Sequence, residues 1–330
     1  DALTTANDTT AIGNQALGAL TTGLKNTAVG AYALDAVTTI NELTAVGYNA
    51  LTACTTGASN AAFGAYALAA TTTGQQNTGI GYAAAYQTTT GSNNTAVGDF
   101  ALGTNTTGDE NTSVGSGSLA ALTTGEKNVA LGYRAGAAIT TGVRNVLIGD
   151  DAGDALTSAG SNVAIGYQAL GADTLGQHSV ALGQDALSTQ NFTTATNVYN
   201  TGIGSAALAS NTTGVYNTAV GGTALSSNQA GQKHTALGYG ALQDLTGGEE
   251  NTAVGYLAGE NMTTASGCVA VGQEALKTLQ TGNFNIAVGR ESLNKVNGAA
   301  NNTAVGKATG ENITTGADNT AVGMIAAQSL

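Results

Sequence analysis

One pattern of apolar and polar residues repeats along the whole chain. The string Asn-Thr-Ala-Val-Gly, or a close variant, returns every 17 residues and gives 19 units, with their glycines at Gly13 to Gly323. One irregularity interrupts the spacing, because Gly183 and Gly204 lie 21 residues apart, which is an insertion of four residues. A period kept this strictly indicates a repeat protein whose successive units stack on one another.

Each unit can be numbered from its glycine as position 0. Residues 98–114 show the pattern, GDFALGTNTTGDENTSV. Position 16 is apolar in all 19 units, position 14 is mostly Thr but becomes Val or Ile in several, and position 4 is Leu in 13. Positions 14 and 16 lie two apart, so they share one face of a strand. Their β-branched side chains predict that this face lines an interior, with Leu at position 4 as the opposite wall.

A 17-residue unit is too short for a helical hairpin repeat but long enough for one coil of a β-solenoid. We therefore predict an all-β fold, a single parallel β-solenoid (β-roll) of about 19 coils over residues 1–330. Each coil should contain a strand over positions 13 to 16, a bend at Gly, a second strand near positions 3 to 7, and a Thr-Thr-Gly turn. The glycine at position 10 is expected to adopt a positive φ. Asn at position 13, present in 14 of 19 units, predicts a ladder of stacked amides.

Stacking in register should place equivalent residues of neighbouring coils side by side, with Val97 next to Val114. The residues expected to define the scaffold are Asn26, Val29, Gly30 and Leu34 in one coil and Asn94, Val97, Gly98 and Leu102 in another. At position 12 the register pairs opposite charges on adjacent coils, namely Lys25 with Glu42, Glu110 with Lys127, and Lys233 with Glu250. Like charges stack at positions 1 and 11, so the charge pattern supports the register only weakly.

Small residues form a second stripe along the repeat. Position 15 is nearly always Ala, or Gly at Gly79 and Gly202, and position 0 is always Gly. This stripe lies on the strand face opposite the Val, where it would let another backbone approach closely. We expect a subunit interface around a threefold axis there, with a smooth solvent-exposed face as the alternative. The end units lack polar caps, so we expect residues 1–330 to be part of a longer fibre with flanking domains.

Composition excludes several classes of protein. The chain has 48 Gly, no Pro and no Trp, with 42% hydrophobic and 9% charged residues, so it is too apolar for disorder. It contains no apolar run of about 18 residues, which argues against membrane insertion. A net charge of −12 repels phosphate backbones and argues against a nucleic-acid partner.

Motifs for cofactors, metals and nucleophilic catalysis are not evident, and we expect no cofactor and no enzyme activity. A glycine-rich string at residues 115–120 lacks the strand and helix context of a dinucleotide site. His178 and His234 are expected at the surface, and Cys54 and Cys268 are expected to be small, partly buried side chains that do not pair.

The densest acidic cluster is Asp150, Asp151 and Asp154. Two carboxylates about 5–10 Å apart can cleave a glycosidic bond. Clustered acids on an acidic protein are more simply solvated surface groups, so glycan cleavage remains an alternative here and no residue is assigned a catalytic role.

Exposed aromatic residues are the candidate contacts for a ligand or receptor. Position 1 is tyrosine in some coils and a charged residue in others, which indicates that it faces solvent. Its tyrosines are Tyr48, Tyr82, Tyr133, Tyr167, Tyr239 and Tyr256. Exposed tyrosines can stack on sugars. The insertion, with Phe192 and Tyr199, is expected to protrude as a loop, and such loops on rigid scaffolds often carry recognition.

Several units match a known motif. The motif is Ser/Asn-x-Ala-Ile/Val-Gly-x-x-Ala. Its first five positions match Asn-Thr-Ala-Val-Gly at 251–255 and Asn-Val-Ala-Ile-Gly at 162–166, and residues 43–50 match the full length except for Leu43 in place of Asn. This motif resembles the head repeats of trimeric autotransporter adhesins. The 17-residue version with a Thr-Thr-Gly turn is similar to repeat arrays of some bacteriophage tail fibres and related bacterial surface proteins. The resemblance implies a homotrimeric, left-handed parallel β-roll displayed at the cell surface or on a virion.

The function predicted is structural: an extracellular or virion fibre shaft, or an adhesin-like stalk, that displays a receptor-binding tip. Its partners would be two further copies of itself, the flanking fibre domains, and a host-surface glycan or protein receptor. Alternatives are a glycan-binding or glycan-cleaving viral fibre and an ice-binding solenoid. Thr fills position 8 in 14 of 18 units and position 9 in 12, which is the basis of the ice-binding alternative.

Overall fold

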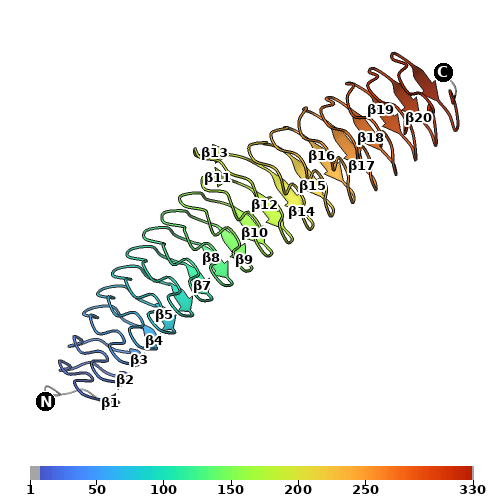
Figure 1. Cartoon of the computed structure of the whole chain (residues 1–330). Coiled ribbons are helices and arrows are strands. Elements are labelled where there is room, and N and C mark those ends of the chain that lie inside the picture. Colours follow the sequence, from blue (N-terminus) through green and yellow to red (C-terminus); the bar gives the residue numbers. More distant parts are fainter. Residues whose placement is uncertain (1–7, 329–330) are drawn as a thin grey trace. The chain divides into compact units, whose positions relative to one another are not determined.

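The computed structural model describes residues 8–328, and every regular element in this range is a β-strand. The chain divides into two compact units, residues 1–162 and residues 163–330. Each unit is a stack of 17-residue coils joined by parallel strand pairing, as the strands of Figure 1 show. The predicted fold class, an all-β parallel β-solenoid, is therefore confirmed.

Each coil contributes one short strand to the stack. The first unit contains β1 (Thr10–Ile12), β2 (Thr27–Val29), β3 (Thr44–Val46), β4 (Ala61–Phe63), β5 (Thr78–Ile80), β6 (Thr95–Val97), β7 (Thr112–Val114), β8 (Val129–Leu131) and β9 (Val146–Ile148). The second contains β10 (Val163–Ile165), β11 (Gly176–Gln177), β12 (Val180–Leu182), β13 (Thr196–Asn197), β14 (Thr201–Ile203), β15 (Thr218–Val220), β16 (Thr235–Leu237), β17 (Thr252–Val254), β18 (Val269–Val271), β19 (Ile286–Val288), β20 (Thr303–Val305) and β21 (Thr320–Val322).

The register follows the 17-residue period. Val97 in β6 pairs with Val114 in β7, and Thr95 pairs with Thr112 on the same two strands. In the second unit Ala253 in β17 pairs with Ala270 in β18. The predicted stacking of equivalent positions is confirmed.

The interior lies on the opposite strand face from the one predicted. Ala28 and Ala96 at position 15 are fully buried, whereas Val29 and Val97 at position 16 are only partly buried. Position 14 is likewise exposed or partly exposed in every strand of the long stacks. The expectation that Val and Thr line the core is therefore wrong. The Ala stripe at position 15 lies inside the coil, so it forms neither the predicted subunit interface nor the alternative solvent-exposed face. Leu34 on the opposite wall at position 4 is fully buried, as predicted.

The buried asparagine at position 13 explains this orientation. Asn94 donates its side-chain amide to the carbonyl of Gly108 at 2.8 Å and to the side-chain oxygen of Asn77 at 3.1 Å. The backbone N–H of Asn94 also donates to Asn77 Oδ1, at 3.0 Å. These bonds require the Asn side chain to point inward, and position 15, two residues later, then points inward too. The predicted amide ladder is confirmed, and both Asn26 and Asn94 belong to it.

Side-chain volume is exchanged between positions inside the coil. Leu147 occupies position 15, where nearly all other coils have Ala or Gly, and it is fully buried. The space it needs comes from Gly136 and Gly153, which replace the usual Leu at position 4. A Cβ added at Gly136 would lie 2.6 Å from Leu147 Cδ1, and one at Gly153 would lie 2.8 Å from Leu147 Cδ2. Positions 4 and 15 therefore face each other across one interior.

The segment at positions 3 to 7 is a series of turns and not the second strand that was predicted. Positions 2 and 4 have positive φ, for example 51° at Phe100 and 55° at Leu102. The two N–H groups consequently point in opposite directions along the stack. The N–H of Phe100 donates to Tyr82 of the preceding coil, and the N–H of Leu102 donates to Ser118 of the following coil, both at 3.0 Å. Backbone hydrogen bonds between coils thus continue without extended strand geometry.

The glycines at positions 0 and 10 are required for close approach of neighbouring coils. Gly98 has a φ of 134°, and a Cβ there would lie 2.7 Å from the carbonyl carbon of Gly115. Gly30 is placed in the same way, with a φ of 133°. Gly57 at position 10 does not adopt the positive φ that was predicted; a Cβ there would instead collide with the carbonyl oxygen of Gly74.

The threonines at position 8 bind the coils together. Thr89 donates its hydroxyl to the carbonyl oxygen of Thr106 at 2.9 Å, and Thr106 donates to Thr123 at 3.0 Å. The hydroxyls at position 8 therefore donate within the stack, whereas the threonines at position 9, such as Thr107 and Thr124, are exposed.

The insertion folds back onto the second unit. Its strand β13 pairs in parallel with β11, with Gly176 opposite Thr196, and this pair is visible beside the main stack in Figure 1. Residues 193–195 are exposed, whereas Phe192 and Val198 are buried. The insertion therefore adds a short second pairing and exposes its tip together with Asn197 and Tyr199.

Candidate functional site

The outer strand face, formed by positions 14 and 16, is uncharged along each unit. Position 16 is apolar in every coil, whereas position 14 is Thr in 12 of 19 coils and aliphatic in the others. Leu131 in β8 and Leu237 in β16 are nearly half exposed on it. Charge-free apolar surfaces that extend along a molecule are typical of interaction sites.

A ladder of aromatic rings is the most distinctive cluster of side chains in the first unit. Tyr32, Tyr48, Tyr66, Tyr82 and Phe100 come from five successive coils, and neighbouring ring centroids are 5.3 to 6.1 Å apart. Neighbouring ring planes meet at 72° to 87°, which is the edge-to-face geometry that aromatic quadrupoles favour. Four of the residues, Tyr32, Tyr48, Tyr82 and Phe100, are 36% to 51% exposed, and Tyr66 is partly buried. The ladder is therefore open to solvent.

The edge-to-face geometry follows from an alternation in the sequence. Tyr32, Tyr66 and Phe100 occupy position 2, whereas Tyr48 and Tyr82 occupy position 1. Successive rings therefore leave the backbone in different directions and meet at steep angles. Where two rings share one position, as Tyr239 and Tyr256 do at position 1, they stack at 15° with centroids 5.8 Å apart.

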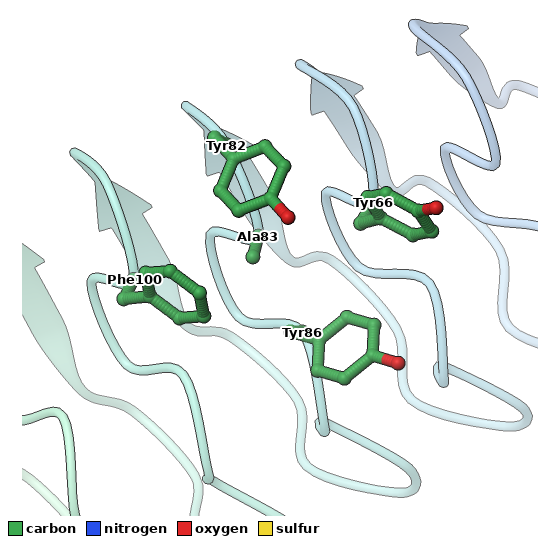
Figure 2. Close-up of a pocket in the computed structure, with 5 residues that line it drawn as sticks. All are labelled: Tyr66, Tyr82, Ala83, Tyr86 and Phe100. Carbon is green, nitrogen blue, oxygen red and sulfur yellow. The ribbon is translucent and has the colours of Figure 1, made fainter.

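A hollow of about 310 Å³ opens at one end of this ladder. Tyr66, Tyr82 and Phe100 line it together with Tyr86 and Ala83, and Figure 2 shows the four rings around it. The ring of Tyr86 stands at 83° to that of Tyr66, with centroids 6.2 Å apart. Burial, and secondarily the neighbouring Tyr48 and Tyr82, raise the pKa of the Tyr66 phenol, so it stays protonated.

The tyrosines predicted from position 1 are all exposed. Tyr48 and Tyr82 belong to the ladder, and Tyr239 and Tyr256 form the stacked pair. The remaining two, Tyr133 and Tyr167, are 56% and 47% exposed. The rings at positions 2 and 5 were not predicted, because position 1 alone indicated exposed tyrosines. The alternating spacing of 16 and 18 residues from Tyr32 to Phe100 is the signal that could have revealed the rings at position 2.

The two aromatic residues of the insertion are placed differently from each other. Phe192 is only 8% exposed, so little of its side chain is available to a receptor. Tyr199 is half exposed and lies between two other rings, His178 at 5.0 Å and Tyr216 at 6.0 Å, with interplanar angles of 25° and 15°. Tyr199 thus remains a candidate contact residue.

The histidines occupy two different environments. His178 is partly exposed in the stack with Tyr199, whereas His234 is only 1% exposed and replaces Asn in the position 13 ladder. The prediction that His234 lies at the surface is therefore wrong. The ring Nδ1 of His234 accepts a hydrogen bond from the backbone N–H of Asn251 at 3.2 Å. The backbone N–H of His234 donates to Asn217 Oδ1 at 2.9 Å. Burial lowers the pKa of His234 to about 4.

The acidic cluster forms ion pairs. Arg134 lies 3.6 Å from a carboxylate oxygen of Asp151 and 3.5 Å from one of Asp154. Burial and the nearby Asp151 raise the pKa of Asp154, while Arg134 opposes that shift. The guanidinium of Arg134 thus pairs with two of the three acids.

Two of the three charge pairs predicted at position 12 are formed. Lys25 lies 3.6 Å from Glu42, and Lys233 lies 2.9 Å from Glu250. The hydrogen bond between Lys233 and Glu250 raises the pKa of Lys233 and lowers the pKa of Glu250. Within the described residues Glu110 forms no ion pair with its neighbour on the next coil.

Cys54 and Cys268 are free and buried, and burial raises the pKa of both thiols. Residues 8–328 contain no cluster of three or more His, Cys, Asp or Glu side chains able to hold a metal ion. In the same part of the chain there is also no helix with the length and hydropathy of a membrane span.

Comparison with known proteins adds no assignment. No protein-family model matches this chain, and no curated protein matches it at a significant level.

Proposed function

We propose that this chain is a structural shaft of an extracellular or virion fibre, in which three copies pack through their outer strand faces. The observation that carries the proposal is the apolar face at positions 14 and 16, which a single chain leaves exposed along each unit. Solvent-facing strands usually carry polar or charged side chains, and these carry none that is charged.

The charge distribution favours copies of the same chain as the occupant of this face. The net charge of −12 resides outside positions 14 and 16, so identical faces can meet without bringing like charges together. Every copy has the same spacing between coils, so side chains on facing copies can interdigitate at each level. The threefold arrangement, and the location outside the cell or on a virion, come from the resemblance to adhesin heads and tail-fibre repeats.

The internal hydrogen bonds suit a mechanical role. Asn side chains at position 13 and Thr hydroxyls at position 8 connect successive coils, in addition to the backbone ladder. Breaking one coil away would exchange several of these hydrogen bonds for bonds to water at once, at a net cost of about 0.5–1.5 kcal/mol each. A stack held in this way resists local opening, as a shaft requires.

Solution mass, measured by light scattering, tests the proposal. The wild-type chain should have a mass close to three times 32.1 kDa. Val97→Asp combined with Val114→Asp should give a single-chain mass, because the two charges lie side by side on the outer face. Thr107→Asp combined with Thr124→Asp, on the exposed turn at position 9, is the matched control and should leave the mass unchanged.

Other outcomes separate the alternatives. A wild-type monomer, or a trimer insensitive to the Val97 and Val114 changes, would refute this interface. A monomer that shows thermal hysteresis would favour ice binding, with the Thr hydroxyls of the outer face in place of those at positions 8 and 9. Loss of polysaccharide viscosity that Asp151→Asn abolishes would favour a glycan-cleaving fibre.

A further inference from the structure

We propose that the hollow between Tyr66, Tyr82, Tyr86 and Phe100 binds a short, neutral segment of a glycan, one or two pyranose units long. This adds a ligand site to the proposed shaft and does not depend on the trimer. The hollow is lined by residues of one unit only, so a single chain contains the whole site.

The size and lining of the hollow suit a saccharide. Its volume of about 310 Å³ lies at the small end of ligand pockets, which span roughly 300–1,000 Å³. Four aromatic rings form its walls, and the small side chain of Ala83 lies between them (Figure 2). A pyranose has apolar C–H faces that pack on aromatic rings and a rim of hydroxyls. The phenol groups of Tyr66, Tyr82 and Tyr86 offer donors and acceptors to that rim.

The ring of Tyr86 is a specific addition to the repeat. No other coil has an aromatic residue at position 5. The neighbours of Tyr86 at this position, Ala69 and Gly103, are both small, so they leave the space around its ring open. Coils elsewhere carry Ser, Gly or Asp at positions 1 and 2, for example Ser116 and Asp150, so the solenoid itself does not require this concentration of rings.

A quaternary ammonium ion is the main competing ligand, since aromatic rings also bind cations. The rings of Tyr82, Tyr86 and Phe100 are 51%, 38% and 48% exposed, so a cation between them would stay largely hydrated. Cation–π contacts at such exposed sites contribute only about 0.5–1 kcal/mol. The lining also lacks a carboxylate to balance the charge. A neutral ligand that uses both ring faces and hydroxyls fits this lining better.

Saturation-transfer NMR and titration with neutral cello-, chito- and malto-oligosaccharides test the site. Two substitutions remove one wall each and introduce a residue that the repeat already tolerates: Tyr82→Ala, as at Ala65, and Tyr86→Ala, as at Ala69. Each should weaken binding about tenfold, the loss expected for one ring contact. Tyr239→Ala removes an equally exposed ring outside the hollow and should leave the affinity unchanged.

The outcomes separate this site from the shaft itself. Three results would overturn the proposal. They are an unchanged saccharide affinity in both Tyr82→Ala and Tyr86→Ala, binding of tetramethylammonium in place of any saccharide, and no binding of any of the three oligosaccharide series. Light scattering on the same samples reports the oligomer independently. A trimer without saccharide binding would refute the ligand site alone, and a monomer that binds saccharide would refute the shaft interface alone.

Discussion

Replacing His234 with Asn should remove a source of acid sensitivity from the second unit. Neutral His234 accepts the backbone N–H of Asn251 through Nδ1, in the place where Asn residues of other coils use their side-chain oxygen. Protonation would put an N–H on Nδ1, so that two donors face each other in a buried site. The Nε2 atom is also buried and forms no well-aligned hydrogen bond among the described residues, so the backbone of Gly248 offsets only part of the cost of burying a charged ring.

The magnitude follows from the pKa. Burial lowers the pKa of His234 from 6.5 to about 4, and each unit corresponds to about 1.4 kcal/mol, so the full effect is ~3 kcal/mol. Because the folded-state pKa lies below the unfolded value, this stability is fully present above pH 6.5. It declines as the pH falls towards about 4, since only the unfolded chain then binds the proton. At pH 5 the loss should be about 2 kcal/mol.

Urea unfolding followed by circular dichroism at pH 7 and pH 5 measures this loss. The free energy of unfolding of wild type should fall by about 2 kcal/mol more than that of His234→Asn, because all other titrating groups are common to both. His178→Asn is the control: Asn is found at that repeat position in Asn93 and Asn301, and the change should leave the pH dependence intact. An equal fall in the free energy of unfolding between pH 7 and pH 5 for wild type and His234→Asn would refute the reasoning that His234 is buried in its neutral form.

Three further predictions concern the interior. Asn111→Ala should destabilise the first unit by about 2–4 kcal/mol in urea, because it leaves buried partners such as the Gly125 carbonyl unpaired, whereas Thr107→Ala should change stability little. Leu147→Ala should cost about 2–5 kcal/mol by opening a cavity, and Gly136→Ala should cost less in Leu147→Ala than in wild type, because the added Cβ then no longer meets Leu147; equal costs would contradict the shared interior. The free thiols should resist a thiol reagent in the folded protein and react once it is unfolded, and rapid labelling of native chains would show that they are accessible.

The fold was predictable because the repeat constrains it strongly. A 17-residue period leaves a β-solenoid as the simplest coil, and parallel in-register pairing then follows, as Val97 beside Val114 shows. The Asn ladder was also readable, since an amide repeated at one position can bond along the stack. The alternating positive φ values at positions 2 and 4 were not, because Leu102 is a residue type that rarely adopts that conformation. Only the hydrogen bonds between coils make it favourable there.

The candidate site was predictable in part. Position 1 was correctly inferred to face solvent from its mixture of tyrosine and charged residues, so Tyr48 and Tyr82 were found. Tyr66 and Phe100 were missed because only position 1 was considered. Rings at positions 1 and 2 of successive coils leave the backbone in different directions and still meet edge to face.

The orientation of the strand was the main error, and the sequence contains the information that corrects it. Apolar volume is exchanged within some coils: the four glycines at position 4 are each followed by a large side chain at position 7, namely Ile139, Leu156, Met262 and Ile313. A Cβ at the corresponding glycines would come within 2.8 to 3.1 Å of those side chains. Leu147 at position 15 accompanies two of the same glycines. Positions 4, 7 and 15 must therefore fill one interior, which places positions 14 and 16 outside. The apolar residues left there do not stabilise the coil from within, and their regular recurrence along the chain is the basis of the interface that we propose.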